Sequence, residues 1–203
     1  MTIQDILRAA SHRSTAFQKA LVAVLREECE FEKNSDGKLT PVIRKERPDS
    51  HGWTFAGLNQ RDDGLPVDEA GNVTATPQWI ADTYYEGNET GSTGYWLPCG
   101  CNMLPSPINI LVFCQAVNEG IGVACRQLQF SINQNGGHLV VDGKVGPATC
   151  NAAMACPDSN TLARTFLEMN REHYRVIVAH NSSLQKNLHG WLNRVDGLQE
   201  QFC

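Results

Sequence analysis

Residues 107–120 read PINILVFCQAVNEG, and this stretch decides the fold class. Its apolar residues cover nearly the whole circumference of a helix, which is typical of a helix buried at the centre of a core. Pro107 suits the beginning of that helix and Gly120 its end. The apolar run of about ten residues is too short to span a membrane, and it contains Asn109 and Gln115. The stretch therefore predicts the central helix of a mainly α-helical protein.

Further helical patterns lie on both sides of this central helix. Before it, Thr76 and Pro77 suit the cap and the first turn of a helix over residues 77–85. The segments predicted after it are a helix over 121–132, a turn at 135–137, a turn at 142–143, a short helix from Pro147, a long helix capped by Ser159 or Asn160, and the closing segment 190–195. The second half of the chain is therefore predicted to be almost wholly helical.

The N-terminal part contains one clear amphipathic helix over residues 15–29, with Ser14 or Thr15 as its cap. One face of it carries, at offsets 0, 4, 7, 8 and 11, Phe17, Leu21, Val24, Leu25 and Glu28. Glu28 thus ends an apolar stripe. It is either a solvated residue of a frayed last turn or a partly desolvated carboxylic acid with the raised pKa of a general acid. On a helix, Glu27 and Glu30 point about 100° and 200° away from it.

The segment between these helices, residues 32–75, is polar and has no sustained period. Alternation at residues 53–55 predicts a small strand or ribbon within it. Residues 87–94 are rich in glycine, serine and threonine and predict a flexible insertion. Long irregular segments in a compact domain are often functional, so this loop region is where we expect a cleft.

Charge and composition exclude several classes of protein. The 203 residues carry 22 acidic and 17 basic side chains, a net charge of −5, and no basic cluster longer than residues 44–45, so nucleic-acid binding is not expected. The N-terminus lacks the apolar run of a secretory signal, and we expect synthesis in the cytoplasm without a signal peptide. Without such a signal, the eight cysteines are expected to be mostly reduced and buried. A C-x-C pair at 99–101 is a weak metal signal alone, and we expect neither a metal nor an organic cofactor.

Six segments occur in an order that matches one enzyme family. They are Phe17-x-x-Ala20-Leu21-x-x-Val24-Leu25-x-x-Glu28-x-x-Phe31; residues 49–58, DSHGWTFAGL; Ala81-x-x-Tyr84-Tyr85 with Tyr95-Trp96; Ile110-Leu111-x-Phe113-x-x-Ala116-Val117-Asn118-x-Gly120 with Leu128-Gln129; Asp142-Gly143-x-x-Gly146-Pro147-x-Thr149; and Arg171-x-x-Tyr174 with residues 190–195, GWLNRV. Together they resemble glycoside hydrolase family 108, the phage and secretion-associated N-acetylmuramidases. The fifth segment resembles the peptidoglycan-binding segment that accompanies them.

The resemblance implies a lysozyme-like helical domain with a small β and loop region near the active cleft. It implies hydrolysis of the bond between N-acetylmuramic acid and N-acetylglucosamine, with Glu28 as general acid and Asp49 across the sugar. Thr54 can hold a water, as in related lysozymes with a Glu, Asp and Thr set. The alternatives are that Asp49 is an ordinary turn residue, that Thr54 is an ordinary strand residue, and that Asp36 takes the place of Asp49.

Several aromatic residues are candidates for binding sugar rings. The sequence also differs from the family pattern at two places. The rings of Trp53, Tyr84, Tyr85 and Tyr95 are expected to stack on sugars or to pack the core; core packing is expected for Trp96 and Trp191. The family pattern E-G-G-Y is here Glu28-Cys29-Glu30-Phe31, so two glycines are replaced by larger residues, and the stretch between Glu28 and Asp49 is longer. These changes favour an alternative: a catalytically impaired peptidoglycan-binding or structural protein of a phage or secretion apparatus.

The predicted organisation is a lysozyme-like catalytic region over residues 14–97 and a helical peptidoglycan-binding region over 98–200, packed into one unit. The expected partner is the peptidoglycan glycan strand, without insertion into a membrane. The place of action is the periplasm or cell wall, reached through a holin-like pore, by lysis or as part of a larger apparatus. A lytic transglycosylase, which would leave an anhydro sugar end, is a further alternative.

Overall fold

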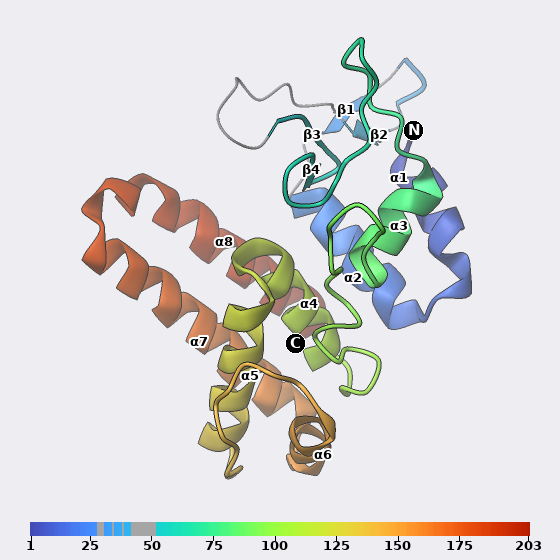
Figure 1. Cartoon of the computed structure of the whole chain (residues 1–203). Helices are drawn as coiled ribbons and strands as arrows, with labels where there is room; N and C mark the ends of the chain where they lie inside the picture. Colours follow the sequence, from blue (N-terminus) through green and yellow to red (C-terminus); the bar gives the residue numbers. More distant parts are fainter. Residues whose placement is uncertain (28–30, 34, 38, 42–51) are drawn as a thin grey trace. The chain divides into compact units, whose positions relative to one another are not determined.

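The computed structural model describes residues 1–27, 31–33, 35–37, 39–41 and 52–203. It is mainly α-helical, as the sequence predicts (Figure 1). Contacts between residues divide the chain into two compact units, Met1–Pro98 and Cys99–Cys203. Across the described ranges, every helix is too short or too polar to cross a membrane.

In the part of the first unit that the structure describes, three helices and a short 3₁₀ turn form the scaffold. They are α1 (Ile3–Ala9), η1 (Ala10–His12), α2 (Thr15–Glu27) and α3 (Pro77–Tyr85). The predicted caps of the two longer helices are confirmed: the hydroxyl of Ser14 accepts the N–H of Phe17 at 3.2 Å, and Thr76 accepts the N–H of Trp79 at 3.1 Å. The sequence did not predict α1, because seven residues with only two buried apolar side chains show too little periodicity.

The apolar stripe predicted on α2 is part of the core of the first unit. Phe17, Leu21 and Leu25 have no exposed surface, and Val24 is 2% exposed. The ring of Phe17 makes edge contacts with Tyr85 and Trp96, at centroid distances of 4.9 and 5.3 Å. Trp96 therefore packs the core, as predicted, and the burial of α2 extends to its last turn.

The described residues of the first unit also form two small antiparallel ribbons. Strand β1 (Phe31–Lys33) pairs with β2 (Leu39–Pro41), and β3 (Thr54–Phe55) pairs with β4 (Leu58–Asn59). The second ribbon confirms the strand predicted at residues 53–55. Asp36, the alternative to Asp49, lies exposed in the turn between β1 and β2.

The second unit is built around α4 (Ile108–Glu119), the helix that the opening stretch predicts. Every residue of it from Ile108 to Ala116 is buried, and it packs against neighbouring helices of the unit (Figure 1). The remaining helices are α5 (Ile121–Gln134), α6 (Pro147–Ala155), α7 (Ser159–His180), the 3₁₀ turn η2 (Ser182–Leu184) and α8 (Gln185–Phe202). The cap of α7 is Asp158, one residue before the predicted cap, because its carboxylate accepts the N–H groups of Asn160 and Thr161.

One buried glutamine ties the segment before α6 to α5. The Nε2 of Gln129 donates to Asp142 at 2.8 Å, to the Lys144 carbonyl at 3.0 Å and to the Thr149 hydroxyl at 3.4 Å. Its Oε1 accepts the N–H of Gly143 at 2.8 Å. The motif segment around Asp142 and its companion Gln129 are therefore a structural unit in this fold.

A second polar cluster joins α4, α7 and α8. The hydroxyl of Tyr174 donates to Gln115 at 3.1 Å and accepts from the amide of Asn118 at 2.5 Å. Arg194 donates to the oxygen of Asn118, and the ring of Trp191 stacks on Tyr174 at 5.2 Å. Residues from the fourth and sixth motif segments thus meet, and they do so inside the helical packing.

Candidate active site

Of the three predicted catalytic residues, the structure places Thr54. Glu28 and Asp49 lie outside the described residues, although α2 ends at Glu27, the residue just before Glu28 in the sequence. Thr54 begins strand β3, is partly exposed, and faces Asn59 across the hairpin register. The geometry of the candidate site is therefore the geometry of this hairpin and of the residues that hold it.

The turn of the hairpin is unusual because Ala56 is left-handed. Ala56 and Gly57 have φ values of 53° and 77°, the signs of the two-residue turn that matches strand twist. A left-handed conformation costs an L-residue about 1–2 kcal/mol, so it needs support from its surroundings. The hydroxyl of Tyr84 supplies that support by donating a buried hydrogen bond to the Ala56 carbonyl at 2.8 Å. Helix α3 thus fixes the hairpin that carries Thr54.

Tyr84 and Tyr85 pack the core, which is one of the two roles that the sequence left open for them. Tyr84 has no exposed surface, and Tyr85 is 9% exposed. The Tyr85 ring lies between Phe17 and the guanidinium of Arg13, whose carbon is 3.9 Å from the ring centroid. Both rings project from the inward face of α3, so neither presents a face for a sugar in this structure.

Trp53 and Tyr95 are the two predicted sugar-binding residues that keep exposed surface. The N–H of Trp53 donates to the side chain of Gln60 at 2.9 Å, and its carbonyl accepts the Gln60 N–H at 3.0 Å. Its ring lies against Gly71, where an added Cβ would stand 3.1 Å from the indole. The Tyr95 ring tilts against Tyr84, with centroids 6.0 Å apart. Both rings are held in place at the edge of the hairpin region.

A buried carboxylate, Asp63, was not singled out from the sequence. It is 3% exposed; it accepts the N–H of Asn59 at 2.9 Å and the hydroxyl of Tyr95 at 3.2 Å. Burial raises the pKa of Asp63, and the neighbouring charge of Asp62 adds to the rise. An Asp-Asp pair before a glycine reads as a surface turn, so the sequence contained no signal for this burial. Asp63 links the end of β4 to one of the exposed rings.

The charge of Asp63 should make stability depend on pH. Because its pKa is raised above the ordinary value of 3.8, the folded state holds this proton more tightly than the unfolded state. The contribution to stability is therefore largest below pH 3.8 and is lost as pH rises through the folded pKa. Asp63→Asn, which can keep both partners, should remove this slope and should be at least as stable as wild type at pH 7. Thermal unfolding between pH 4 and 7 measures it.

The control for this experiment is Glu89→Gln, which neutralises an exposed carboxylate of the same unit. It should leave the pH slope of the wild type unchanged. An unchanged pH slope in Asp63→Asn would show that Asp63 does not cause it, and a lower unfolding temperature than wild type at neutral pH would show that the charged carboxylate stabilises the fold; either result would refute the assignment.

The loop after α3 is a closely hydrogen-bonded turn, where the sequence predicted a flexible insertion. Asn88 organises it. Its Nδ2 donates to the Asp63 carbonyl at 2.7 Å and to the Thr83 hydroxyl at 3.0 Å. Its Oδ1 accepts the N–H and the hydroxyl of Thr90 at 3.0 and 2.8 Å. Composition misled the prediction because glycine and threonine occur both in mobile linkers and in tight turns.

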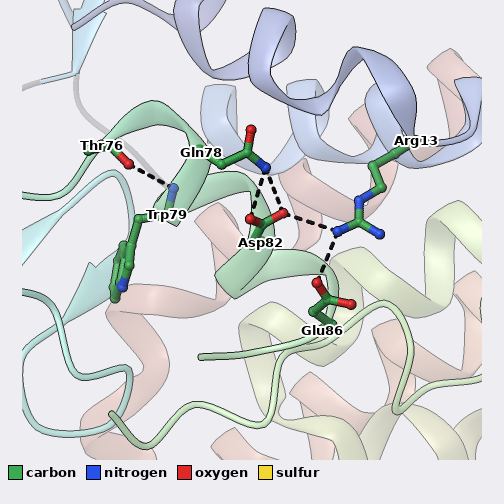
Figure 2. A network of polar contacts seen from close by, with 6 residues as sticks. All are labelled: Arg13, Thr76, Gln78, Trp79, Asp82 and Glu86. Atoms are coloured by element: carbon green, nitrogen blue, oxygen red, sulfur yellow. Dashed lines mark hydrogen bonds and ion pairs between the residues drawn. The ribbon is translucent and has the colours of Figure 1, made fainter. Parts of the chain in front are cut away.

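An ion-pair network fixes the beginning of α2 on α3 (Figure 2). Arg13 donates to Asp82 at 3.1 Å and to Glu86 at 3.0 Å, and Gln78 donates to both oxygens of Asp82. Burial of Arg13 opposes its charge, but the hydrogen bonds to the two carboxylates outweigh this effect and raise its pKa. The network holds the helix that leads to Glu28 against the helix that supports the hairpin.

The described residues offer no cluster of three or more His, Cys, Asp or Glu side chains that could hold a metal ion. No disulfide joins any two of the seven cysteines among them. The sulfurs of Cys99 and Cys125 lie 3.9 Å apart in the second unit.

Comparison with known proteins relates the second unit to peptidoglycan. Residues 123–196 match the family described as a predicted peptidoglycan domain. Among solved structures, the chain is similar to SagA of Brucella abortus, with a TM-score of 0.63 and 18% identity over 91% of this chain and 92% of that one. The likeness extends over both units and shows a shared fold. No curated protein sequence matches.

Proposed function

We propose that the protein cleaves the glycan strand of peptidoglycan as an N-acetylmuramidase, with Glu28 as general acid. The observation that carries the proposal is the match of residues 123–196 to a predicted peptidoglycan domain. A domain of this kind brings the chain to its polymer, and the first unit would supply the chemistry. The protein would act in the periplasm or cell wall and would reach it through a holin-like pore, by lysis or within a phage or secretion apparatus.

The buried face of α2 supports the assignment of Glu28. Leu25 has no exposed surface, and Glu28 follows it by three residues along the same stripe. A carboxyl group that continues a desolvated face favours its neutral form, which raises its pKa. A general acid for the leaving oxygen needs that protonated state near neutral pH.

The hairpin of β3 and β4, which Tyr84 holds in place, supports a role for Thr54 in orienting water and for the nearby aromatic rings in binding sugar. In the proposed reaction, Glu28 gives its proton to the glycosidic oxygen, and Asp49 takes a proton from the water that attacks the anomeric carbon. Thr54, on a hairpin fixed by Tyr84, would orient that water. Trp53 and Tyr95, which keep exposed surface, would stack on sugar rings. Peptidoglycan is the one partner that the reaction requires, and no cofactor enters it.

A second function is a peptidoglycan-binding protein without catalysis. The observation that favours it is the Cys29-Glu30 sequence after Glu28, where the muramidase pattern has two glycines. Glycines allow close approach of a ligand to the backbone, and larger residues remove that space. The match of the second unit to a predicted peptidoglycan domain agrees equally well with this alternative.

Mass spectrometry of peptidoglycan digested with the purified protein separates these functions. We expect fragments that end in a reducing N-acetylmuramic acid. Each is heavier than the corresponding anhydro fragment by one water molecule, because hydrolysis adds water across the bond. Anhydro ends would identify a lytic transglycosylase, and reducing N-acetylglucosamine ends a glucosaminidase. Unchanged peptidoglycan, together with sedimentation of the protein with the polymer, would establish the non-catalytic alternative.

A further inference from the structure

A groove runs between α5 and α7 of the second unit. It has a volume of about 290 Å³, and its walls are mainly apolar. The side chains that form most of them are Val123, Gln127, Phe130, Met169, His173 and Val176. Phe130 and Val176 are 47% and 43% exposed, so apolar side chains from both helices of the groove are open to solvent.

The groove contains a buried polar group that the fold does not use. Gln127 is only 6% exposed, and within the described part of the chain neither its Nε2 nor its Oε1 has a hydrogen-bond partner. A buried amide without partners destabilises a protein, so such a group calls for an explanation. Gln129, two residues along the same helix, shows the contrast, because all of its amide is engaged. Gln127 lines the groove, so a ligand that enters it and reaches this amide would supply the missing partners.

The chemistry of that amide selects the kind of ligand. A primary amide offers a donor and an acceptor side by side. One residue of an extended peptide presents its N–H and C=O to the same side, as in an antiparallel sheet, and can bond both. The trans acetamido group of an amino sugar points its N–H and C=O in opposite directions and can satisfy only one. An extended peptide thus fits the groove better than a sugar.

The charges at the groove favour a peptide that carries a carboxylate. Arg126 is exposed at its edge, and among the described residues no carboxylate lies within ion-pair distance of its guanidinium. The other two charged lining residues have partners: Glu172 pairs with Arg175 at 3.7 Å, and His173 lies 3.3 Å from Glu119. The apolar walls suit small side chains such as the methyl group of alanine.

We propose that this groove binds the stem peptide of peptidoglycan in an extended conformation. The Gln127 amide pairs with the N–H and C=O of one peptide residue, and Arg126 pairs with a free carboxylate. The stem peptide combines alanine methyl groups with free carboxylates, and all the groove residues lie within the range 123–196 that matches a predicted peptidoglycan domain. The inference rests on the proposed function for its choice of polymer, and it adds which part of the polymer the second unit recognises.

Calorimetric titration of the full chain with N-acetyl-L-alanyl-γ-D-glutamyl-L-lysyl-D-alanine tests this inference. Gln127→Met keeps the size of the side chain and removes both hydrogen bonds, so the affinity should fall by about tenfold or more. Arg126→Gln should also weaken binding and should reduce its dependence on salt. Gln134→Met, the same change at the exposed end of α5, is the matched control and should bind as wild type does.

Thermal unfolding of the same variants separates a binding role from a structural one. Gln127→Met should unfold at the same or a higher temperature than wild type, because it removes a buried amide without partners. A lower unfolding temperature would show that the amide supports the fold. Wild-type affinity in Gln127→Met would overturn the inference, as would no binding of the peptide, or Gln127-dependent binding of N-acetylglucosamine tetramer, which has no peptide.

This binding assay does not depend on catalysis. Cleavage of peptidoglycan without peptide binding would reject the groove assignment and leave the muramidase proposal in place. Peptide binding without cleavage would reject the muramidase proposal and leave the groove assignment in place.

Discussion

Glu28→Gln should abolish most of the lytic activity and leave the fold intact. Glutamine has the shape of glutamic acid but has no acidic proton to give to the leaving oxygen. General acid catalysis contributes roughly 10²–10⁴-fold to the rate of such reactions, so turnover should fall at least by that factor. The release of soluble muropeptides from purified peptidoglycan measures it. Circular dichroism and the unfolding temperature should match those of wild type.

The matched control for this experiment is Glu27→Gln. Glu27 is the last residue of α2, and the helical spacing of the sequence predicts that it points about 100° away from Glu28. Its variant should retain nearly all the activity. Near wild-type turnover in Glu28→Gln would refute the assignment, and loss of activity in Glu27→Gln alone would move the acid by one residue.

Asp49→Asn should also lower turnover by roughly 10²–10⁴-fold, because an amide cannot take a proton from the attacking water. If Asp49 activates water opposite Glu28, the two carboxyl groups should lie roughly 6.5–9.5 Å apart, and the anomeric centre should invert. Proton NMR of the first product formed from a soluble glycan measures the configuration directly. We expect inversion, because the long stretch between Glu28 and Asp49 and a water held by Thr54 suit the wider separation.

Asp36→Asn distinguishes the two candidate partners of Glu28. Asp36 lies exposed in the turn between β1 and β2, and its variant should keep near wild-type activity. Retention of configuration would point to a nucleophile about 5–5.5 Å from the acid. Full activity in Asp49→Asn combined with a large loss in Asp36→Asn would assign the second carboxylate to Asp36.

Features that depend on neighbouring residues along the chain could be predicted from the sequence. The all-round apolar pattern of α4 and the stripe of α2 follow from helical geometry, because residues three or four apart share a face. The caps Ser14 and Thr76 are local as well, since a hydroxyl bonds an N–H group three residues on. The mainly helical fold class rests on the same kind of pattern.

Features that depend on residues far apart in the chain could not be predicted in this way. The pattern of α3 shows where Tyr84 lies on a helix, but not that its hydroxyl reaches the Ala56 carbonyl, 28 positions away. The sequence around Asp63 is typical of a surface turn. Its burial becomes evident only in the structure, where Tyr95 donates to its carboxylate and Asn88 donates to its carbonyl. The first helix, α1, is too short to be periodic and is held by its capping box and by contact with α3.

The sequence by itself determined the mainly helical fold class, the central helix α4 and the order of the motif segments, because hydrophobic periodicity and capping act over a few residues. It also supplied the hypothesis for Glu28 and Asp49, which lie outside the described residues and stay predictions. Only the tertiary structure decided that Tyr84 supports the hairpin of Thr54, while Trp53 keeps exposed surface. Only the packing of α7 on α5 leaves the amide of Gln127 buried beside a groove and without a partner among the described residues, because burial and hydrogen-bond satisfaction depend on which surfaces meet.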